Sequence, residues 1–191
     1  MRTALLLLAG WLLAASPALA APEIASASAV SGPGDPYATP HAGPVDLGDG
    51  SGPMVITYRN GRVQHVGLDH DEAGKQVYFA QVQISPNRHG VGWLAEYDAC
   101  AQARPCPLAL VVWYAGRPRL RFSPREGVIR AWQFLAGGRQ VAVQSGSAQG
   151  GGPSQYRLLA TATGRSLGYW EDGSAAPRPP WLKFFTRAIA P

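Results

Sequence analysis

The chain has 191 residues, of which 46% are hydrophobic and 15% charged, with a formal net charge of +5 and two cysteines. That length is typical of one domain, and two cysteines are too few to complete a structural zinc site. Nearly all of the positive charge comes from arginine, because Lys75 and Lys183 are the only lysines. A modest excess of positive charge of this kind serves solubility and does not require a charged partner.

The first 20 residues have the pattern of a secretory signal peptide. Arg2 precedes an apolar run over residues 4–15, and Ala18-Leu19-Ala20 places small residues before the expected cut after Ala20. No later stretch is long and apolar enough for a transmembrane helix. The pattern predicts a periplasmic or extracellular protein. For such a basic protein, anionic envelope polymers are more plausible partners than nucleic acid.

Residues 21–53 are rich in Gly, Pro, Ala and Ser, with little apolar surface to bury. This composition predicts a flexible lead-in to the folded domain. We expect that domain to span residues 54–174. It begins with a half-unit over 54–68, in which Asn60-Gly61 indicates a hairpin turn.

Two longer units follow, over residues 77–123 and 128–170. Residues 84–93 return loosely as 134–143, and residues 110–117 return as 158–165, at offsets of 50 and 48 residues. Each unit has four short strand-like runs separated by Gly- or Pro-containing turns. A repeat of about 50 residues built from short strands is typical of a propeller blade.

Two segments carry a family resemblance. Ile84-Ser85-Pro86-Asn87-Arg88-His89-Gly90-Val91-Gly92-Trp93 resembles the S-P-D-G-x-x-[IV]-[AG]-[FW] segment of WD40-like and TolB-like blades. Residues 160–167, Ala-Thr-Ala-Thr-Gly-Arg-Ser-Leu, resemble their D-x-x-[ST]-G-[KR]-x-[LI] hairpin. The chain also resembles small uncharacterised secreted bacterial proteins. The resemblance implies an all-β fold of antiparallel four-stranded blades and no particular activity.

Two and a half blades are fewer than the four to eight that usually close a propeller. We therefore expect an incomplete propeller whose exposed strand edges favour pairing, with a homo-oligomer that completes the ring as one outcome. Residues 175–191 form a Pro-rich segment and an expected short C-terminal helix. That helix either caps a sheet edge or lies at a membrane surface, with Trp181, Phe185, Ala188 and Ile189 on one face.

Cys100 and Cys106 predict a disulfide, because an even number of cysteines in an oxidising compartment favours pairing. The short loop that it closes would contribute on the order of 2 kcal/mol. This loop and the glycine-rich residues 146–153 occupy the same place in the two units. We expect both loops on the same side of the sheets, where a ligand would be sought.

The densest group of potential metal ligands is weak evidence for a metal site. It also fits a polar turn between strands, which favours Asp and Gly without any metal. The candidate ligands are His65, Asp69, His70, Asp71 and Glu72. No segment predicts a cofactor, and neither Ser145 nor Ser147 lies in a nucleophile motif.

Two further groups are candidates for partner binding. Arg117, Arg119 and Arg121 alternate along one strand, which places three guanidinium groups on one face, either to bind an anion or to protect an edge. Trp93 and Tyr97 also share a strand face and would suit a sugar ring or a peptide side chain.

The sequence therefore favours a non-catalytic secreted module that binds an envelope protein or an anionic polymer. Two alternatives stay open. One is a metal-binding protein or envelope hydrolase that uses residues 65–72, and the other is a structural subunit that completes a propeller by self-association.

Overall fold

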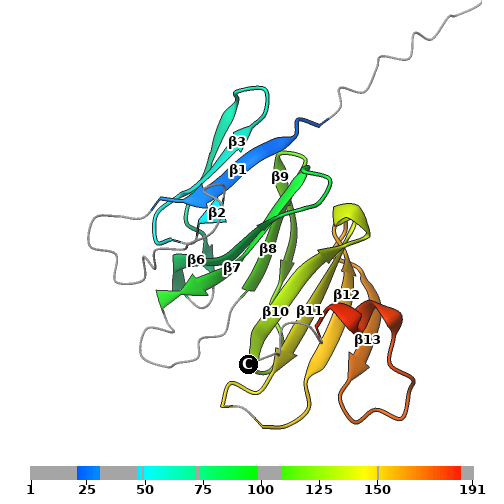
Figure 1. Cartoon of the computed structure of the whole chain (residues 1–191). Coiled ribbons are helices and arrows are strands. Elements are labelled where there is room, and N and C mark those ends of the chain that lie inside the picture. The colour runs from blue at the N-terminus through cyan, green and yellow to red at the C-terminus, as the bar shows by residue number, and fades with distance from the viewer. Residues whose placement is uncertain are drawn as a thin grey trace, which may run out of the picture.

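In the computed structural model, residues 21–30, 47–48, 50–71, 74–98, 109–149 and 151–185 are described. They form three open sheets that succeed one another along the chain, as Figure 1 shows. The pairing is antiparallel except between β1 and β2. The expected all-β class is confirmed. Among the described strands, none of the first sheet pairs with the last, so these strands form no closed ring.

The first sheet has the order β2-β1-β3-β4. Its strands are β1 (Ile24–Ala29), β2 (Leu47–Gly48), β3 (Met54–Tyr58) and β4 (Val63–Val66). The flexible lead-in expected over residues 21–53 is therefore wrong for Ile24–Ala29. This segment pairs with β3 and buries Ile24 and Ala27 almost completely. A register shift in the pairing with β3 lies between Ile24 and Ser26, so Ile24 and Ala27 are both buried although three positions separate them.

The middle sheet has the order β5-β6-β7-β8-β9 and corresponds to the first complete unit of the repeat. Its strands are β5 (His70–Asp71), β6 (Gly74–Ile84), β7 (Gly90–Tyr97), β8 (Ala109–Tyr114) and β9 (Arg117–Phe122). The third sheet is a four-stranded meander of β10 (Val128–Leu135), β11 (Gln140–Gly146), β12 (Gln155–Ala160) and β13 (Ser166–Glu171). A short 3₁₀ turn, η2 (Ala136–Gly138), joins β10 to β11.

The turn between β6 and β7 carries the blade-like sequence and is held by its own polar groups. The Gly90 N–H donates to Ser85 Oγ at 2.8 Å, and the Arg88 N–H donates to the Ser85 carbonyl at 2.8 Å. The His89 N–H donates to Asn87 Oδ1 at 3.2 Å. The motif therefore forms a turn. Its side chains also attach the turn to other strands, because Asn87 Nδ2 donates to the Tyr114 hydroxyl and Arg88 Nη1 donates to the Ile24 carbonyl.

Two hydrophobic layers hold the three sheets together because both faces of the middle sheet are buried. The face that carries Trp93 and Ala95 packs on the first sheet through Ile24, Met54 and Ile56. The opposite face packs on the third sheet. The buried residues of this second layer, from both sheets, are Leu94, Leu110, Val112, Leu120, Ile129, Trp132, Phe134, Val141, Val143 and Leu159.

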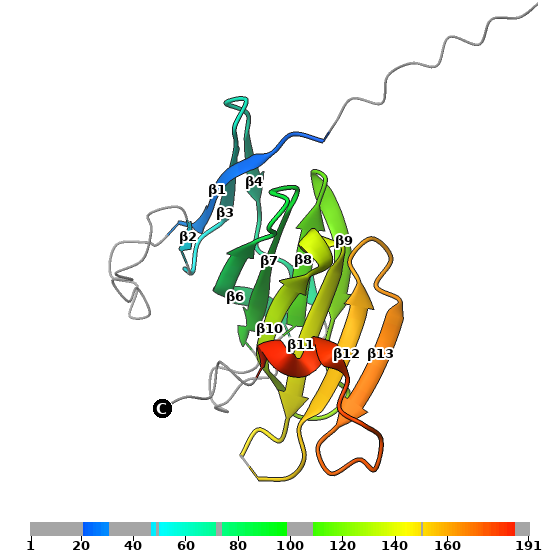
Figure 2. The same cartoon turned by 45° about the vertical axis from the view of Figure 1, so that its right-hand side comes forward.

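The C-terminal segment covers the far face of the third sheet, as Figure 2 shows. It is not the helix expected from the sequence but the short 3₁₀ turn η3 (Pro180–Phe184). Leu182 and Phe185 are buried against Tyr156 and Leu158. Residues three apart lie on one side of a 3₁₀ turn, so one turn is enough to direct both side chains inward. Ala188 and Ile189 lie outside the described residues.

Gly92 marks the closest approach between the middle and third sheets. A Cβ at this position would lie 2.6 Å from Cη2 of Trp132, a residue that is only 3% exposed. We predict that Gly92→Ala lowers the free energy of unfolding by about 1–3 kcal/mol through this overpacking. Urea denaturation measures the change. Gly67→Ala is the matched control, because nothing lies within 4 Å of its added Cβ, and an equal loss in both variants would contradict the packing described here.

Leu182 is the residue through which η3 contributes to stability. Its side chain is fully buried, whereas Phe184 in the same turn is 38% exposed. We predict that Leu182→Ala lowers the free energy of unfolding by about 2–3 kcal/mol, and that Phe184→Ala changes it by less than about 0.5 kcal/mol. Thermal or urea unfolding of the two variants tests this. If Leu182→Ala lost as little stability as Phe184→Ala, the burial of Leu182 would not contribute to the fold.

Candidate binding pocket

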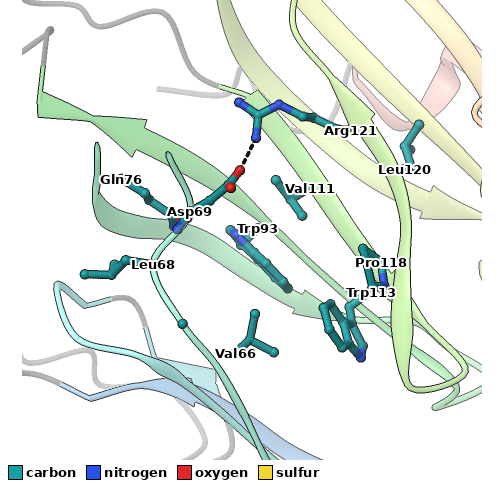
Figure 3. A pocket seen from close by; sticks show the side chains of 11 residues that line it. Val66, Leu68, Asp69, Gln76, Trp93, Val111, Trp113, Pro118, Leu120 and Arg121 are labelled. Carbon is teal, nitrogen blue, oxygen red and sulfur yellow. Dashed lines mark hydrogen bonds and ion pairs between the residues drawn. The ribbon is translucent and has the colours of Figure 1, made fainter. Parts of the chain in front are cut away.

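A pocket of about 490 Å³ lies where the connection after β4 crosses the face of the middle sheet. Figure 3 shows the side chains of this connection opposite those of β7, β8 and β9. The crossing arises because the chain leaves the first sheet at its last strand and enters the middle sheet on the far side of β6. The lining residues are Val66, Gly67, Leu68, Asp69, Gln76, Trp93, Val111, Trp113, Pro118, Leu120 and Arg121.

Two tryptophans from neighbouring strands supply most of the aromatic surface. Trp93 on β7 is 2% exposed and packs on Phe79, with ring centroids 5.5 Å apart. Trp113 on β8 is half-buried. Within the described part of the chain, neither buried indole N–H has a hydrogen-bond acceptor. An unsatisfied buried donor costs about 1–3 kcal/mol, so these two N–H groups lower the stability of the free protein.

A charged group at the edge of the pocket ties the crossing segment to β9. Arg121 Nη1 donates to Asp69 Oδ2 at 2.5 Å, and the Tyr97 hydroxyl donates to the same oxygen at 3.2 Å. The Arg121 guanidinium also lies 5.2 Å from the centre of the Tyr97 ring. The other oxygen of Asp69 accepts the His70 N–H at 2.8 Å. Both carboxylate oxygens are therefore engaged within the protein.

Gln76 on β6 fixes the position of the connection after β4 through hydrogen bonds to Asp69. Its side chain is 1% exposed, and its Oε1 accepts the Asp69 N–H at 3.2 Å. Its Nε2 donates to the Tyr78 carbonyl at 3.1 Å, and its own N–H donates to the Asp69 carbonyl at 2.8 Å. These bonds satisfy both ends of a buried amide and place Asp69 next to Arg121.

Residues from three groups that the sequence singled out meet here: Asp69, the pair Trp93 and Tyr97, and Arg121. The pocket also depends on Leu68, Gln76 and Pro118, which sequence reasoning missed. Leu68 is the last residue of the half-unit expected over residues 54–68, and nothing in the local pattern distinguishes it. Only the position of Leu68 in the repeat could have pointed to the pocket, because it lies in the connection between two units, and this connection crosses the next sheet.

The expected strip of three arginines is corrected by a β-bulge. Val111 lies opposite Arg121 and Tyr114 opposite Arg117, with a register shift between Val112 and Trp113. Paired residues project from the same face of a sheet, and neighbours along a strand from opposite faces. Arg121 therefore lies on the Val111 face, and Arg117 lies on the other face of β9. The side chain of Arg119 lies outside the described residues.

The metal hypothesis gains no support from the geometry. His65 and His70 are exposed, and Asp69 is committed to Arg121 and Tyr97. The described residues contain no group of three or more His, Cys, Asp or Glu side chains arranged to hold a metal ion. The side chain of Asp71 and the whole of Glu72 lie outside the described residues. Cys100 and Cys106 also lie outside them, so their disulfide stays a prediction.

Comparison with known proteins adds no identification. No protein-family model matches the sequence, and a search of curated proteins found no match. No helix within the described ranges has the length and apolar character needed to cross a membrane.

The Asp69 carboxylate should stabilise the fold more than a comparable surface carboxylate does. We predict that Asp69→Ala lowers the free energy of unfolding by about 1 kcal/mol, because it removes the acceptor of three hydrogen bonds on a half-exposed group. Glu23→Ala breaks the 3.1 Å ion pair with Arg59, another pair of exposed side chains, and should cost less than about 0.5 kcal/mol. Urea unfolding measures both. Equal costs would show that the Asp69 contacts do not anchor the crossing segment.

Proposed function

We propose that this chain is a non-catalytic, secreted or periplasmic binding module that holds a peptide segment of a partner protein in the pocket described above. The proposal depends on one observation: a largely apolar pocket is lined by two tryptophans, Trp93 and Trp113, whose buried indole N–H groups have no acceptor among the described residues. A peptide matches such a pocket in two ways: an apolar side chain fills the cavity, and a backbone carbonyl can accept a hydrogen bond.

The chemistry of the pocket favours an apolar group over a polyanion as its occupant. The only described arginine that lines it, Arg121, is paired with Asp69 and packed against Tyr97. Arg117 projects from the opposite face of β9, so the two guanidinium groups do not form one surface. A polymer with repeated negative charges would find no continuous row of cations among these described side chains.

The arrangement of the sheets favours a binding module over a subunit that completes a ring. Three successive sheets support the resemblance to propeller blades. However, Trp181, Leu182 and Phe185 pack on the far face of the third sheet, where a fourth blade would stack. Such stacking would require the displacement of two buried side chains, Leu182 and Phe185. The location outside the cytoplasm is supported by the signal-like residues 1–20.

Peptides selected from a random library against residues 21–191 test the proposal. We expect enrichment of sequences with one large apolar residue. Isothermal titration with a selected peptide should show at least tenfold weaker binding to Leu68→Asp and to Pro118→Glu, which place charge inside the pocket and at its mouth. Pro118 is already exposed, so its variant is expected to fold normally.

Val63→Asp is the matched control. Val63 is 49% exposed and lies on β4 with its side chain on the face away from Val66. Its affinity for the peptide should stay within twofold of the wild-type value. Undiminished binding to both pocket variants, with unchanged unfolding midpoints, would place the peptide elsewhere and refute the proposal.

A further inference from the structure

A second pocket, of about 540 Å³, lies between the connection after β9 and the third sheet. It occupies the same place in the next unit of the repeat as the first pocket, since both form where the chain crosses from one sheet to the next. Its lining is far more polar. The lining residues are Phe122, Ser123, Pro124, Arg125, Glu126, Ser145, Gln155, Arg157 and Tyr169.

Arg157 is held in this pocket by aromatic rings. Its guanidinium carbon lies 5.2 Å from the centre of the Tyr169 ring and 6.0 Å from that of Phe122. The Tyr169 hydroxyl donates to Glu171 Oε2 at 2.8 Å, which fixes the ring and raises the pKa of Tyr169. Because contact with aromatic faces uses the plane of a guanidinium, its N–H groups at the edge stay available to an acceptor.

The charges lining this pocket are unbalanced. Arg125 and Arg157 supply two positive charges, and Glu126 supplies one negative charge. Within the described residues, neither arginine forms an ion pair with a carboxylate, in contrast to Arg121 and Asp69 in the first pocket. Ser145, which is 3% exposed, and Gln155 add polar groups to the wall. Counted over these lining residues the net charge is +1, while Glu171, which accepts the Tyr169 hydroxyl, lies next to the pocket without lining it.

We propose that this second pocket binds a peptide carboxylate, with the fork of Arg157 as the principal donor and Arg125 as the second cation. A planar carboxylate accepts two parallel hydrogen bonds from a guanidinium. A carboxylate is favoured over a phosphate dianion, because Glu126 and the neighbouring Glu171 repel a group with two negative charges more strongly than a group with one. The carboxylate comes either from an acidic side chain or from a chain terminus. This site does not depend on the occupant proposed for the first pocket.

Titration of the protein, residues 21–191, with three short peptides tests the proposal by NMR of the arginine Nε–H groups. One peptide is capped at both ends and carries a single aspartate, the second has only a free C-terminal carboxylate, and the third is capped and carries asparagine instead. We expect saturable shifts of the Arg157 signal with one or both carboxylate peptides and none with the third. The tighter of the first two identifies the source of the carboxylate.

Arg157→Gln and Arg125→Gln should each weaken binding at least fivefold. Arg165→Gln is the charge-matched control, because Arg165 is exposed at the turn between β12 and β13 and does not line the pocket. The unfolding midpoint of each variant verifies folding, and Arg125→Gln keeps the test valid if Arg157→Gln is destabilised. Leu68→Asp should leave this binding unchanged, which separates the result from that for the first pocket.

Three outcomes would overturn the proposal. The first is equal binding of the asparagine peptide, which would show that charge is not recognised. The second is tighter binding of inorganic phosphate than of either carboxylate peptide. The third is an identical effect of Arg125→Gln, Arg157→Gln and Arg165→Gln, which would show that net charge alone attracts the peptide.

Discussion

Burial of both faces of the middle sheet holds the three sheets of this protein together. Successive residues of β7 enter different layers, since Trp93 packs toward the first sheet and Leu94 toward the third. Neither outer sheet would have a partner for its inner face without the middle one. The glycine at position 92 is part of this arrangement, because it leaves room for the Trp132 ring between the middle and third sheets.

The two ends of the stack differ in the character of their outer faces. The third sheet ends under Leu182 and Phe185, which come from a single 3₁₀ turn of the same chain. On the first sheet, the residues that alternate with the buried Met54, Ile56 and Tyr58 are Val55 and Thr57, which are half-buried. Ser26 and Ser28 lie directly opposite them on β1. Small and polar side chains of this kind suit a terminal face, as in other repeat architectures.

Both pockets follow from the way in which the chain passes between sheets. A connection that crosses the face of the next sheet cannot fill the space beneath it as closely as a paired strand does. In the first crossing, Asp69 neutralises Arg121, and the remaining surface is apolar and aromatic. In the second crossing, aromatic rings hold Arg157, and its charge has no carboxylate partner among the described residues. The same architecture therefore supplies two sites of different chemistry, separated by β9.

The sequence by itself determined the strands of the two full units and their turns, because these features are local. Apolar residues alternate along each strand, and residues such as Ser85, Asn87 and Gly90 form a turn by bonding to neighbours a few positions away. Its prediction for Ile24–Ala29 failed because small residues form a strand only when a partner such as β3 is present. In β6, a register shift between Ala80 and Gln83 interrupts the strand alternation, so Phe79 and Val82 enter the same layer.

Only the tertiary structure decided which side chains share a site. Asp69, Trp93 and Arg121 belong to three separate segments, and they meet because one crossing segment lies over the middle sheet. The bulge in β9 then separates Arg121 from Arg117, although their spacing in the sequence predicts a common face. Register shifts and inter-sheet crossings depend on packing between distant segments, so no local pattern encodes them. The sequence determined the strands, and their packing decided where a ligand would be bound.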